Sequence, residues 1–192
     1  MPGGSIITTN LTLSGLVSDS FHTTIGKVVT LDGTAALARS IGQAGIIELT
    51  DLPADFNAAI SVKVRLDDIR FTNPAGSKAN SATVRTTIRD SSSTFYTEDI
   101  NVLVNRSLNL EGTERTTSDG SALWTSTQLN DLRLGLEVTA AVPDIGSGVS
   151  IDFAYIELKY STAPPLSYDS TIGKIVMDGG TTIIDQGTII ID

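Results

Sequence analysis

Alternation of apolar and polar residues constrains the fold of this chain more than any other feature of its sequence. Apolar residues occupy every second position over 60–66, and the same alternation recurs over 132–138 and, less regularly, over 151–160. A period of two places the apolar residues on one face of an extended strand, as a half-buried strand requires. We therefore expect these three segments to be core strands.

The common phase of the three segments predicts which residues face the core. The adjacent acids Asp67 and Asp68 break the alternation, which resumes at Ile69 and Phe71. This shift of phase predicts a β-bulge or a bend that carries exposed acids. We expect the following residues to share one core: Ile60, Val62, Val64, Leu66, Leu132, Leu134, Leu136, Val138, Ile151 and Phe153.

Shorter segments rich in Val, Ile and Thr supply the other expected strands. Each is bounded by Gly, Pro, Asn, Asp or Ser, which favour turns. Asp-Gly pairs beginning at Asp32, Asp119 and Asp178 predict tight turns, because glycine tolerates the positive φ that such turns need. Helix is expected only as one short turn over 125–131. The additional strands are predicted over 24–31, 45–49, 82–89, 95–103 and 107–110.

Length and composition indicate one core of the all-β class. The chain has 192 residues, enough for one hydrophobic core of ordinary size. Its apolar residues are mostly Val, Ile, Leu and Ala, and aromatic residues make up only 5%, a composition that suits pleated sheets. We expect a jelly-roll or β-sandwich core with extended, β-rich N- and C-terminal arms.

Two prolines and an internal repeat predict how the chain is divided. Pro164 and Pro165 end the last core strand, because proline cannot donate to a β-ladder. The motif Thr-Ile-Gly-Lys-(Val/Ile)-Val begins at Thr24 and again at Thr171, which indicates a structural repeat, with coincidence in a Thr/Ile/Gly-rich chain as the alternative. The expected organisation is an N-terminal arm over 1–35, a core over 36–162 and a C-terminal arm over 163–192.

The C-terminal arm ends in two isoleucine-rich segments, which predict a hairpin. Free edges of such strands expose unpaired backbone groups and invite aggregation. We therefore expect the repeat segments of both arms to be ordered only by pairing with each other or with neighbouring chains, so that the chain forms a homo-oligomer. The residues expected at this interface are Thr24, Ile25, Lys27, Val29, Ile172, Lys174, Val176, Ile183, Ile184, Ile189, Ile190 and Ile191.

The composition argues against several classes of function. There is no cysteine, so neither a disulfide framework nor thiolate chemistry is available. The net charge of −9 would repel a phosphate backbone, which argues against a nucleic-acid partner. The first residues lack the pattern of a secretion signal, and no later stretch approaches a membrane span. We expect a soluble chain with no membrane partner and no cofactor.

No set of residues in the sequence matches a catalytic site. His22 is the only histidine, and no partner for it can be placed from the sequence. The acids at 67–68 are adjacent on a strand and would point to opposite faces, whereas glycosidase chemistry needs two converging carboxyl groups. We expect no enzymatic activity. Calcium held by loop carboxylates stays an alternative, for example around Asp119, Asp144 or Asp169.

The segment from Trp124 to Tyr160 resembles a module of tailed-bacteriophage virion proteins. In that module a Trp precedes a short turn, a step similar to Leu-Asn-Asp-Leu leads into an alternating strand, and a loop returns through a last strand. Here the last strand reads Ile-Asp-Phe-Ala-Tyr-Ile-Glu-Leu-Lys-Tyr over 151–160. Trp124 itself is expected to anchor one end of the core rather than to stack on a sugar.

This resemblance implies a jelly-roll protein of the virion, most like a capsid decoration or cement protein. Such proteins often sit as trimers on the shell and clamp neighbouring capsid subunits. The expected partner is then the major capsid protein of the same virion, and the expected location is the capsid surface after synthesis in the host cytoplasm. The alternative is a phage tail or fibre jelly-roll module that binds a host carbohydrate.

A chelator is expected to leave the fold intact. No ligand set with metal-binding spacing is visible in the sequence, so EDTA should leave the melting temperature nearly unchanged. Scanning calorimetry with and without EDTA checks this, and a large drop on chelation would favour the calcium alternative.

Overall fold

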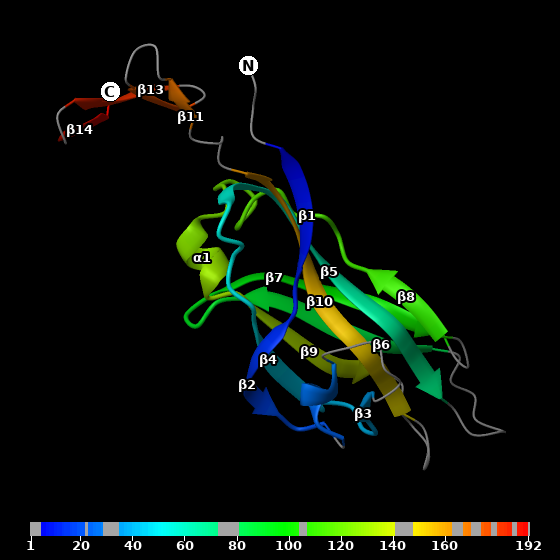
Figure 1. Ribbon diagram of the computed structural model, residues 1–192. Coiled ribbons are helices and arrows are strands. Elements are labelled where there is room, and N and C mark those ends of the chain that lie inside the picture. Colours follow the sequence, from blue (N-terminus) through cyan, green and yellow to red (C-terminus); the bar gives the residue numbers. More distant parts are fainter. Residues whose placement is uncertain are drawn as a thin grey trace.

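The chain folds into two antiparallel five-stranded sheets that form a β-sandwich (Figure 1). The computed structural model describes residues 5–21, 23–28, 35–72, 81–103, 107–140 and 148–162, and the backbone of the strands at 167–169, 174–177, 180–185 and 188–191. Sheet A has the strand order β1-β10-β5-β8, with β3 also paired to β10, and sheet B has the order β2-β4-β9-β6-β7. Within the described strands, sheet C, with the order β11-β12-β13-β14, pairs with neither. The all-β expectation is confirmed.

The bounds of the elements are as follows. Sheet A contains β1 (Ile6–Leu11), β3 (Ala36–Ala38), β5 (Phe56–Thr72), β8 (Ser107–Glu111) and β10 (Gly148–Thr162). Sheet B contains β2 (Leu13–Asp19), β4 (Ala44–Leu49), β6 (Ser81–Arg89), β7 (Thr94–Leu103) and β9 (Arg133–Ala140). Sheet C contains β11 (Ser167–Asp169), β12 (Lys174–Met177), β13 (Gly180–Asp185) and β14 (Thr188–Ile191). The helical elements are the 3-10 turn η1 (Ile25–Lys27) and the helix α1 (Ser126–Asn130).

The pairings of the sandwich are nested. Strand β6 pairs with β7, β5 with β8, β4 with β9 and β1 with β10, all antiparallel. The first half of the sandwich therefore folds back along the second half like one long hairpin that is distributed over two sheets. As a result, the first strand and the last strand of the sandwich lie side by side in sheet A (Figure 1).

The inner faces of sheets A and B enclose one hydrophobic core. The predicted alternation is confirmed in β5 and β9, and eight of the ten predicted core residues are buried. Four other predicted strands, over 45–49, 82–89, 95–103 and 107–110, correspond to β4, β6, β7 and β8. The eight buried residues are Val62, Val64, Leu66, Leu132, Leu134, Leu136, Val138 and Ile151.

Two predicted core residues, Ile60 and Phe153, are only half-buried. Ile60 is the extra residue of a bulge, because Lys159 pairs with Ser61 whereas the next residue, Tyr160, pairs with Ala59. Phe153 lies outside the core cluster, and its ring packs on that of Tyr155 with a centroid distance of 4.6 Å. The core placement of both residues was therefore wrong.

The position of Phe153 follows from a change of phase shared by the two central strands of sheet A. On β5 the buried residue after Leu66 is Ile69, three positions later instead of two, and Asp68 between them has a φ of +49°. On β10 the buried hydrophobic residue after Ile151 is likewise Ala154, three positions later. The bulge expected at the acid pair is thus confirmed, but both acids are half-buried rather than exposed.

Helix α1 and Trp124 close one end of the sandwich, as expected. The Thr125 hydroxyl accepts from the Gln128 backbone N–H, and the Gln128 side chain accepts from the Thr125 backbone N–H, which is a complete capping box. Trp124 is buried, its ring meets Phe95 edge-on at 5.3 Å, and its Nε1 donates to the Arg115 carbonyl at 3.2 Å. Trp124 is a core anchor.

The first copy of the internal repeat is not a strand in its described part. Residues 25–27 form η1, and Ile25 is fully buried. The Ile25 backbone N–H donates to the Asp19 carboxylate at 2.9 Å, and the Thr24 hydroxyl caps the turn. A Cβ at Gly45 would lie 2.6 Å from Ile25 Cδ1, so glycine is required where this turn enters the core. The strand predicted over 24–31 is therefore wrong over residues 24–28. Residues 29–31 lie outside the described part of the chain.

The two arms differ from the expected arrangement. The proposed N-terminal arm over 1–35 supplies β1 to sheet A and β2 to sheet B, because both strands bond to neighbours in the core. In the second repeat copy Lys174 begins β12, which pairs with β11 and β13 and, as far as the first copy is described, not with that copy. The predicted C-terminal hairpin is present as β13 and β14.

One of the three predicted Asp-Gly turns lies in the described part of the chain. Gly120 has a φ of +89°, as the Asp119-Gly120 turn requires, and the other two Asp-Gly pairs lie outside the described residues.

Leu134 tests the assignment of the core. Its side chain is fully buried, so Leu134→Ala should lower the free energy of unfolding by about 2–5 kcal/mol. The control Leu123→Ala truncates a leucine that is 73% exposed and should change it by less than about 0.5 kcal/mol. Urea unfolding followed by tryptophan emission measures both, and equal stability of the two variants would contradict the core assignment.

Candidate interaction surfaces

One segment, Ile6–Asp19, supplies the outer strand of both sheets on one side of the sandwich. It runs as β1 in sheet A, crosses at Thr12 and continues as β2 in sheet B (Figure 1). The crossing is held by Thr50, whose backbone N–H donates to the Thr12 carbonyl at 2.8 Å and whose hydroxyl accepts from the Thr12 backbone N–H at 3.3 Å. We term this segment the N-terminal edge.

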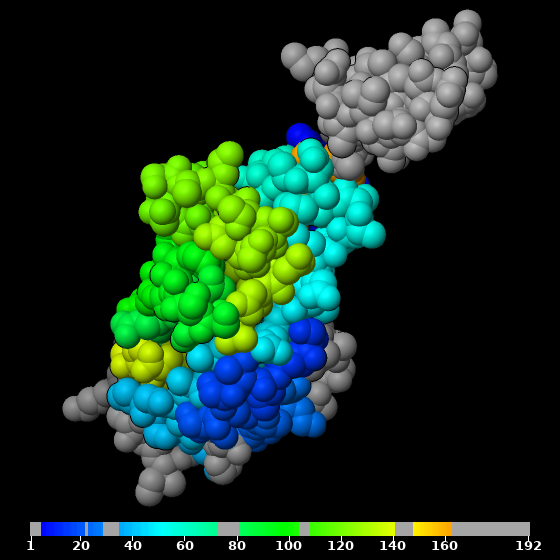
Figure 2. Space-filling view, turned by 90° about the vertical axis from the view of Figure 1, so that its left-hand side faces the viewer, coloured from blue at the N-terminus to red at the C-terminus, as the bar shows by residue number. Residues whose placement is uncertain are grey.

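The N-terminal edge exposes large apolar side chains. The adjacent residues Leu16 and Val17 are 50% and 43% exposed, and Ile6 is 64% exposed. Strand β2 changes register against β4 between Leu13 and Gly15 and again between Leu16 and Ser18. Such irregularities turn side chains away from strict alternation, so both neighbouring apolar residues reach the surface. In Figure 2 the blue N-terminal residues form a surface patch that faces the viewer.

The backbone of this edge is open within the described part of the chain. There β1 pairs only with β10, and β2 pairs only with β4. Proteins commonly protect an edge strand with charged residues or proline. Residues 6–18 include neither, and the first charged residue of the edge is Asp19. Over residues 6–18 the N-terminal edge therefore combines unpaired backbone groups with side chains that carry no charge, some of which are apolar and exposed.

The opposite side of the sandwich is tied together by polar contacts. Glu98 on β7 accepts from the Thr113 backbone N–H at 2.8 Å and from its hydroxyl at 2.7 Å, and it lies 3.7 Å from Arg115 Nη2. Arg115 in turn exchanges backbone hydrogen bonds of 2.8 and 2.9 Å with Val62 on β5. This side links sheet A to sheet B by specific hydrogen bonds, in contrast to the N-terminal edge.

The outer face of sheet A carries a ladder of alternating charges. Lys63 and Arg65 on β5 lie between Glu111 on β8 and Glu157 on β10. Arg65 Nη2 lies 3.0 Å from a Glu157 oxygen, Lys63 Nζ lies 3.3 Å from Glu111 and 3.5 Å from Glu157, and Arg65 also pairs with Glu111. Neighbouring opposite charges across strands favour this register modestly. The two positive and two negative charges of this ladder cancel.

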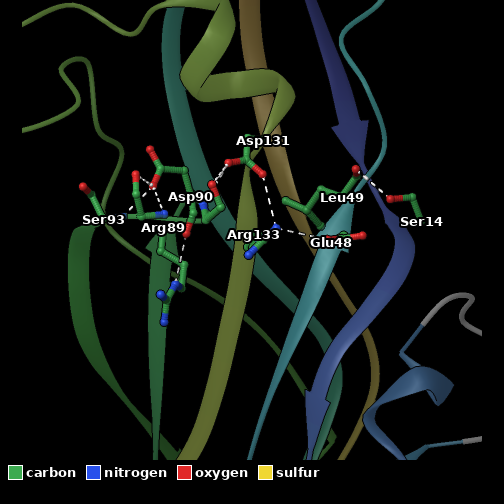
Figure 3. A network of polar contacts seen from close by, with 10 residues as sticks. Ser14, Glu48, Leu49, Arg89, Asp90, Ser93, Asp131 and Arg133 are labelled. Carbon is green, nitrogen blue, oxygen red and sulfur yellow. Dashed lines mark hydrogen bonds and ion pairs between the residues drawn. The ribbon is translucent and has the colours of Figure 1, made fainter.

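A polar depression of about 220 Å³ lies beside β2, where β4 and β9 also meet the end of α1. Arg133 Nη2 bridges Glu48 at 3.2 Å and Asp131 at 3.4 Å, and the Ser14 hydroxyl donates to the Leu49 carbonyl at 2.8 Å (Figure 3). The depression is lined by Ser14, Glu48, Leu49, Asp51, Asn130, Asp131 and Leu132. Its carboxylates and amide can bond hydroxyl groups, but none of these residues offers an aromatic platform.

Asp131 is held in its charged form by its neighbours. Its Oδ2 accepts from the Ser91 hydroxyl and, at 2.9 Å, from the Ser91 backbone N–H. These bonds, foremost that of the hydroxyl, and the nearby Arg133 lower the pKa of Asp131, against the opposing effect of partial burial. Asp131 thus ties the turn at 90–93 to the start of β9, which is a structural role.

A second depression, of about 330 Å³, lies at the change of phase in sheet A. Asp68 is held by Arg70, whose Nε and Nη2 donate to its two carboxylate oxygens at 3.0 and 2.8 Å. Asp152, across the pair of strands, is 2% exposed. The depression is lined by Ala35, Asp68, Arg70, Ser150 and Asp152. The Arg70 guanidinium binds both oxygens of the Asp68 carboxylate, so the arrangement differs from a pair of converging carboxyl groups available for catalysis.

The predicted interface residues fall into three groups. Ile25 is fully buried and is therefore not available to a partner, which corrects that assignment, whereas Thr24 and Lys27 are exposed on η1. Val29 and Ile172 lie outside the described residues, as do His22 and Asp144. The remaining predicted residues all lie on strands of sheet C: Lys174, Val176, Ile183, Ile184, Ile189, Ile190 and Ile191. Sequence reasoning missed the N-terminal edge, although its uncharged run over 6–18 was a visible signal.

Comparison with known proteins does not identify a family for the chain. No protein-family model matches it, and no curated protein is significantly similar. Within the described residues, no helix is long and apolar enough to cross a membrane. The described residues likewise contain no cluster of three or more His, Cys, Asp or Glu side chains that could hold a metal ion.

The lowered pKa of Asp131 predicts a pH-dependent contribution to stability. A carboxyl group whose pKa is lower in the folded state stabilises the fold above its unfolded-state pKa and loses this effect as the pH falls through its folded-state pKa. Asp131→Asn should therefore be less stable than the parent at neutral pH, and the difference should shrink between about pH 5 and about pH 1. Urea unfolding across this range measures it, and a difference that does not vary with pH would contradict the assigned role.

Proposed function

We propose that the chain is a structural virion protein that binds and stabilises the outer surface of a bacteriophage capsid, as decoration or cement proteins do, without catalysis of its own. The observation that carries the proposal is the N-terminal edge, an open strand edge that carries no charge over residues 6–18 and continues across both sheets. Its partner would be the major capsid protein of the same virion, and its location would be the capsid surface after synthesis in the host cytoplasm.

The strand topology supports the proposal that the chain is a virion protein. We propose that the sandwich is a jelly roll, in which an eight-stranded hairpin is wrapped into two four-stranded sheets. The nested pairs β1·β10, β4·β9, β5·β8 and β6·β7 fit this description, and β2 and β3 are then additions to it. Jelly rolls are frequent in viral capsid proteins and in lectins. The resemblance of the segment from Trp124 to Tyr160 to virion modules points to the first of these two groups.

The chemistry of the N-terminal edge suits a protein chain as partner. An extended segment can add to an open strand edge through main-chain hydrogen bonds, while exposed side chains enter pockets of the partner. Leu16 and Val17 offer such side chains, and residues 6–18 carry no charge of their own. The Glu48 carboxylate of the paired strand β4 lies over Gly15, so a partner would bind beside this charge. A surface of this kind strengthens a shell by burying apolar area between subunits.

One observation favours a second candidate, a tail or fibre module that binds a host carbohydrate. The polar depression beside β2 offers the carboxylates of Asp51 and Glu48 and the amide of Asn130. Such groups hydrogen-bond sugar hydroxyls, and lectins share the jelly roll. Since the depression has no aromatic residue in its lining, we place this candidate second. Binding of the labelled chain to a glycan array, abolished by Asp51→Ala, would favour it over the capsid role.

The capsid proposal is tested on the N-terminal edge. The double variant Leu16→Lys/Val17→Lys adds two charges where the edge would meet the shell, and it should bind heads of the parent phage that lack this chain at least about tenfold more weakly. Co-sedimentation of the purified chain with such heads measures this.

The matched control is Leu123→Lys, because Leu123 is also exposed and apolar but lies away from the edge. It should sediment with the heads like the parent. Melting temperatures near that of the parent would show that both variants are folded, as expected for exposed positions. Undiminished sedimentation of the folded double variant would refute the role of the N-terminal edge.

A further inference from the structure

The carboxylate of Glu48 lies over strand β2 at the N-terminal edge. Glu48 on β4 pairs directly with Gly15 on β2. A Cβ at Gly15 would lie 2.7 Å from Glu48 Oε2, so the absence of a side chain at this position leaves the space that the carboxylate occupies. A charge from the second strand of sheet B is thus placed on the outer strand, as Figure 3 shows for Glu48 beside the strand of Ser14.

The two oxygens of this carboxylate face opposite sides of β4. Oε1 lies 3.2 Å from Arg133 Nη2, on the neighbouring strand β9. Oε2 lies over Gly15, on the side where β2 pairs only with β4 among the described strands. The Glu48 side chain is 47% exposed. Arg133 therefore holds the carboxylate from the inner side, and Oε2 faces the open edge.

The surroundings of Glu48 are negative in sum. Asp51 and Asp131 line the same polar depression as Glu48, and Arg133 bridges Glu48 and Asp131. These three carboxylates and one guanidinium leave an excess of negative charge beside β2. A docked chain without a positive charge would remove water from these groups without compensation, whereas a Lys or Arg side chain would replace that water by an ion pair.

A second copy of the same edge does not supply this positive charge. Residues 5–21, which contain β1 and β2, include no Lys or Arg, and each copy of the chain has a net charge of −9. Two such edges brought together would place the carboxylate of one Glu48 near that of the other, and like charges repel. The complementary charge therefore belongs to a different chain.

We propose that the N-terminal edge binds an extended segment of a partner protein in which a Lys or Arg lies opposite Gly15 and pairs with Glu48 Oε2. Directly opposed residues of neighbouring strands have Cβ atoms about 5 Å apart, so a basic side chain at that position reaches the carboxylate. Glu48 then selects among partner segments by charge. The inference rests on the proposed function, because it specifies the partner of the same edge.

Two glutamates on the outer face of sheet B provide a matched test. Glu48 and Glu137 are 47% and 40% exposed, and each pairs with one arginine, Arg133 and Arg85 respectively. Glu48→Gln should bind phage heads that lack this chain about tenfold more weakly than the unaltered chain does, whereas Glu137→Gln should bind like the unaltered chain. Co-sedimentation with such heads measures both.

Salt provides a second readout of the same ion pair. Raising the salt concentration from about 0.1 M to about 1 M shortens the screening length from about 10 Å to about 3 Å. The unaltered chain and Glu137→Gln should lose more affinity for the heads over this range than Glu48→Gln, which lacks the charge. A merely structural role of Glu48 would leave this difference at zero.

The variant Gly15→Ala separates the position of the charge from its presence. The added Cβ meets only the end of a flexible side chain, so the Glu48 carboxylate moves away from the edge while its charge is kept. Gly15→Ala should therefore also weaken binding to the heads, and it should have no further effect in a chain that already carries Glu48→Gln. Melting temperatures near that of the unaltered chain show that each variant is folded, and Gly15→Ala decides alone if Glu48→Gln is not.

The results separate this inference from the capsid proposal. Equal binding and equal salt dependence of Glu48→Gln and Glu137→Gln would overturn the inference, while weaker binding of Leu16→Lys/Val17→Lys would still support the capsid proposal. Failure of the unaltered chain to sediment with the heads would refute both. Self-association of the unaltered chain that is lost in Leu16→Lys/Val17→Lys would identify a second copy as the occupant of the edge and would likewise overturn the inference.

Discussion

The long antiparallel pairing of β5 with β10 supports the rest of the sandwich. These strands span Phe56–Thr72 and Gly148–Thr162, and β8, β1 and β3 are all hydrogen-bonded to one or the other. Their inner faces supply many of the fully buried residues, including Leu66 and Ile156. Sheet B can close the core only because this ladder presents a continuous apolar surface opposite it. Loss of this pairing would remove the framework on which both edges of sheet A depend.

The same ladder contains the irregularities that shape the surface. Ile60 is an extra residue on β5, and Asp68 takes a left-handed backbone conformation farther along the strand. Bulges of this kind twist strands and redirect side chains. Here they turn Phe153 out of the core and bring Asp152 into a buried position beside the depression in sheet A. The depression on sheet A thus lies where the alternation fails, whereas the charge ladder lies where it holds.

Much of the fold could be predicted from the sequence, because the period of two is a local signal that tertiary packing reinforces. It identified β5, β9 and β10, and the acid pair at 67–68 marked a real bulge. Segment 24–28 was misassigned, because the hydrogen bond from Ile25 to the carboxylate of Asp19 overrides the β-preference of Ile and Val. The N-terminal edge was missed since strand order depends on long-range pairing, which a periodic pattern does not report. The burial of Ile25 in the core was missed for the same reason, because it depends on contacts between distant parts of the chain.

The pairing of β1 with β10 has a consequence for when the N-terminal edge is formed. Ile6 and its partner Ser161 lie at opposite ends of the sandwich sequence. Strand β1 therefore has no place to bond until the ribosome has released β10, and folds dominated by such distant pairings form slowly. The uncharged segment over 6–18 would otherwise be a hazard in the nascent chain. Because its site in sheet A is created last, the N-terminal edge becomes structured only when the whole sandwich has been made.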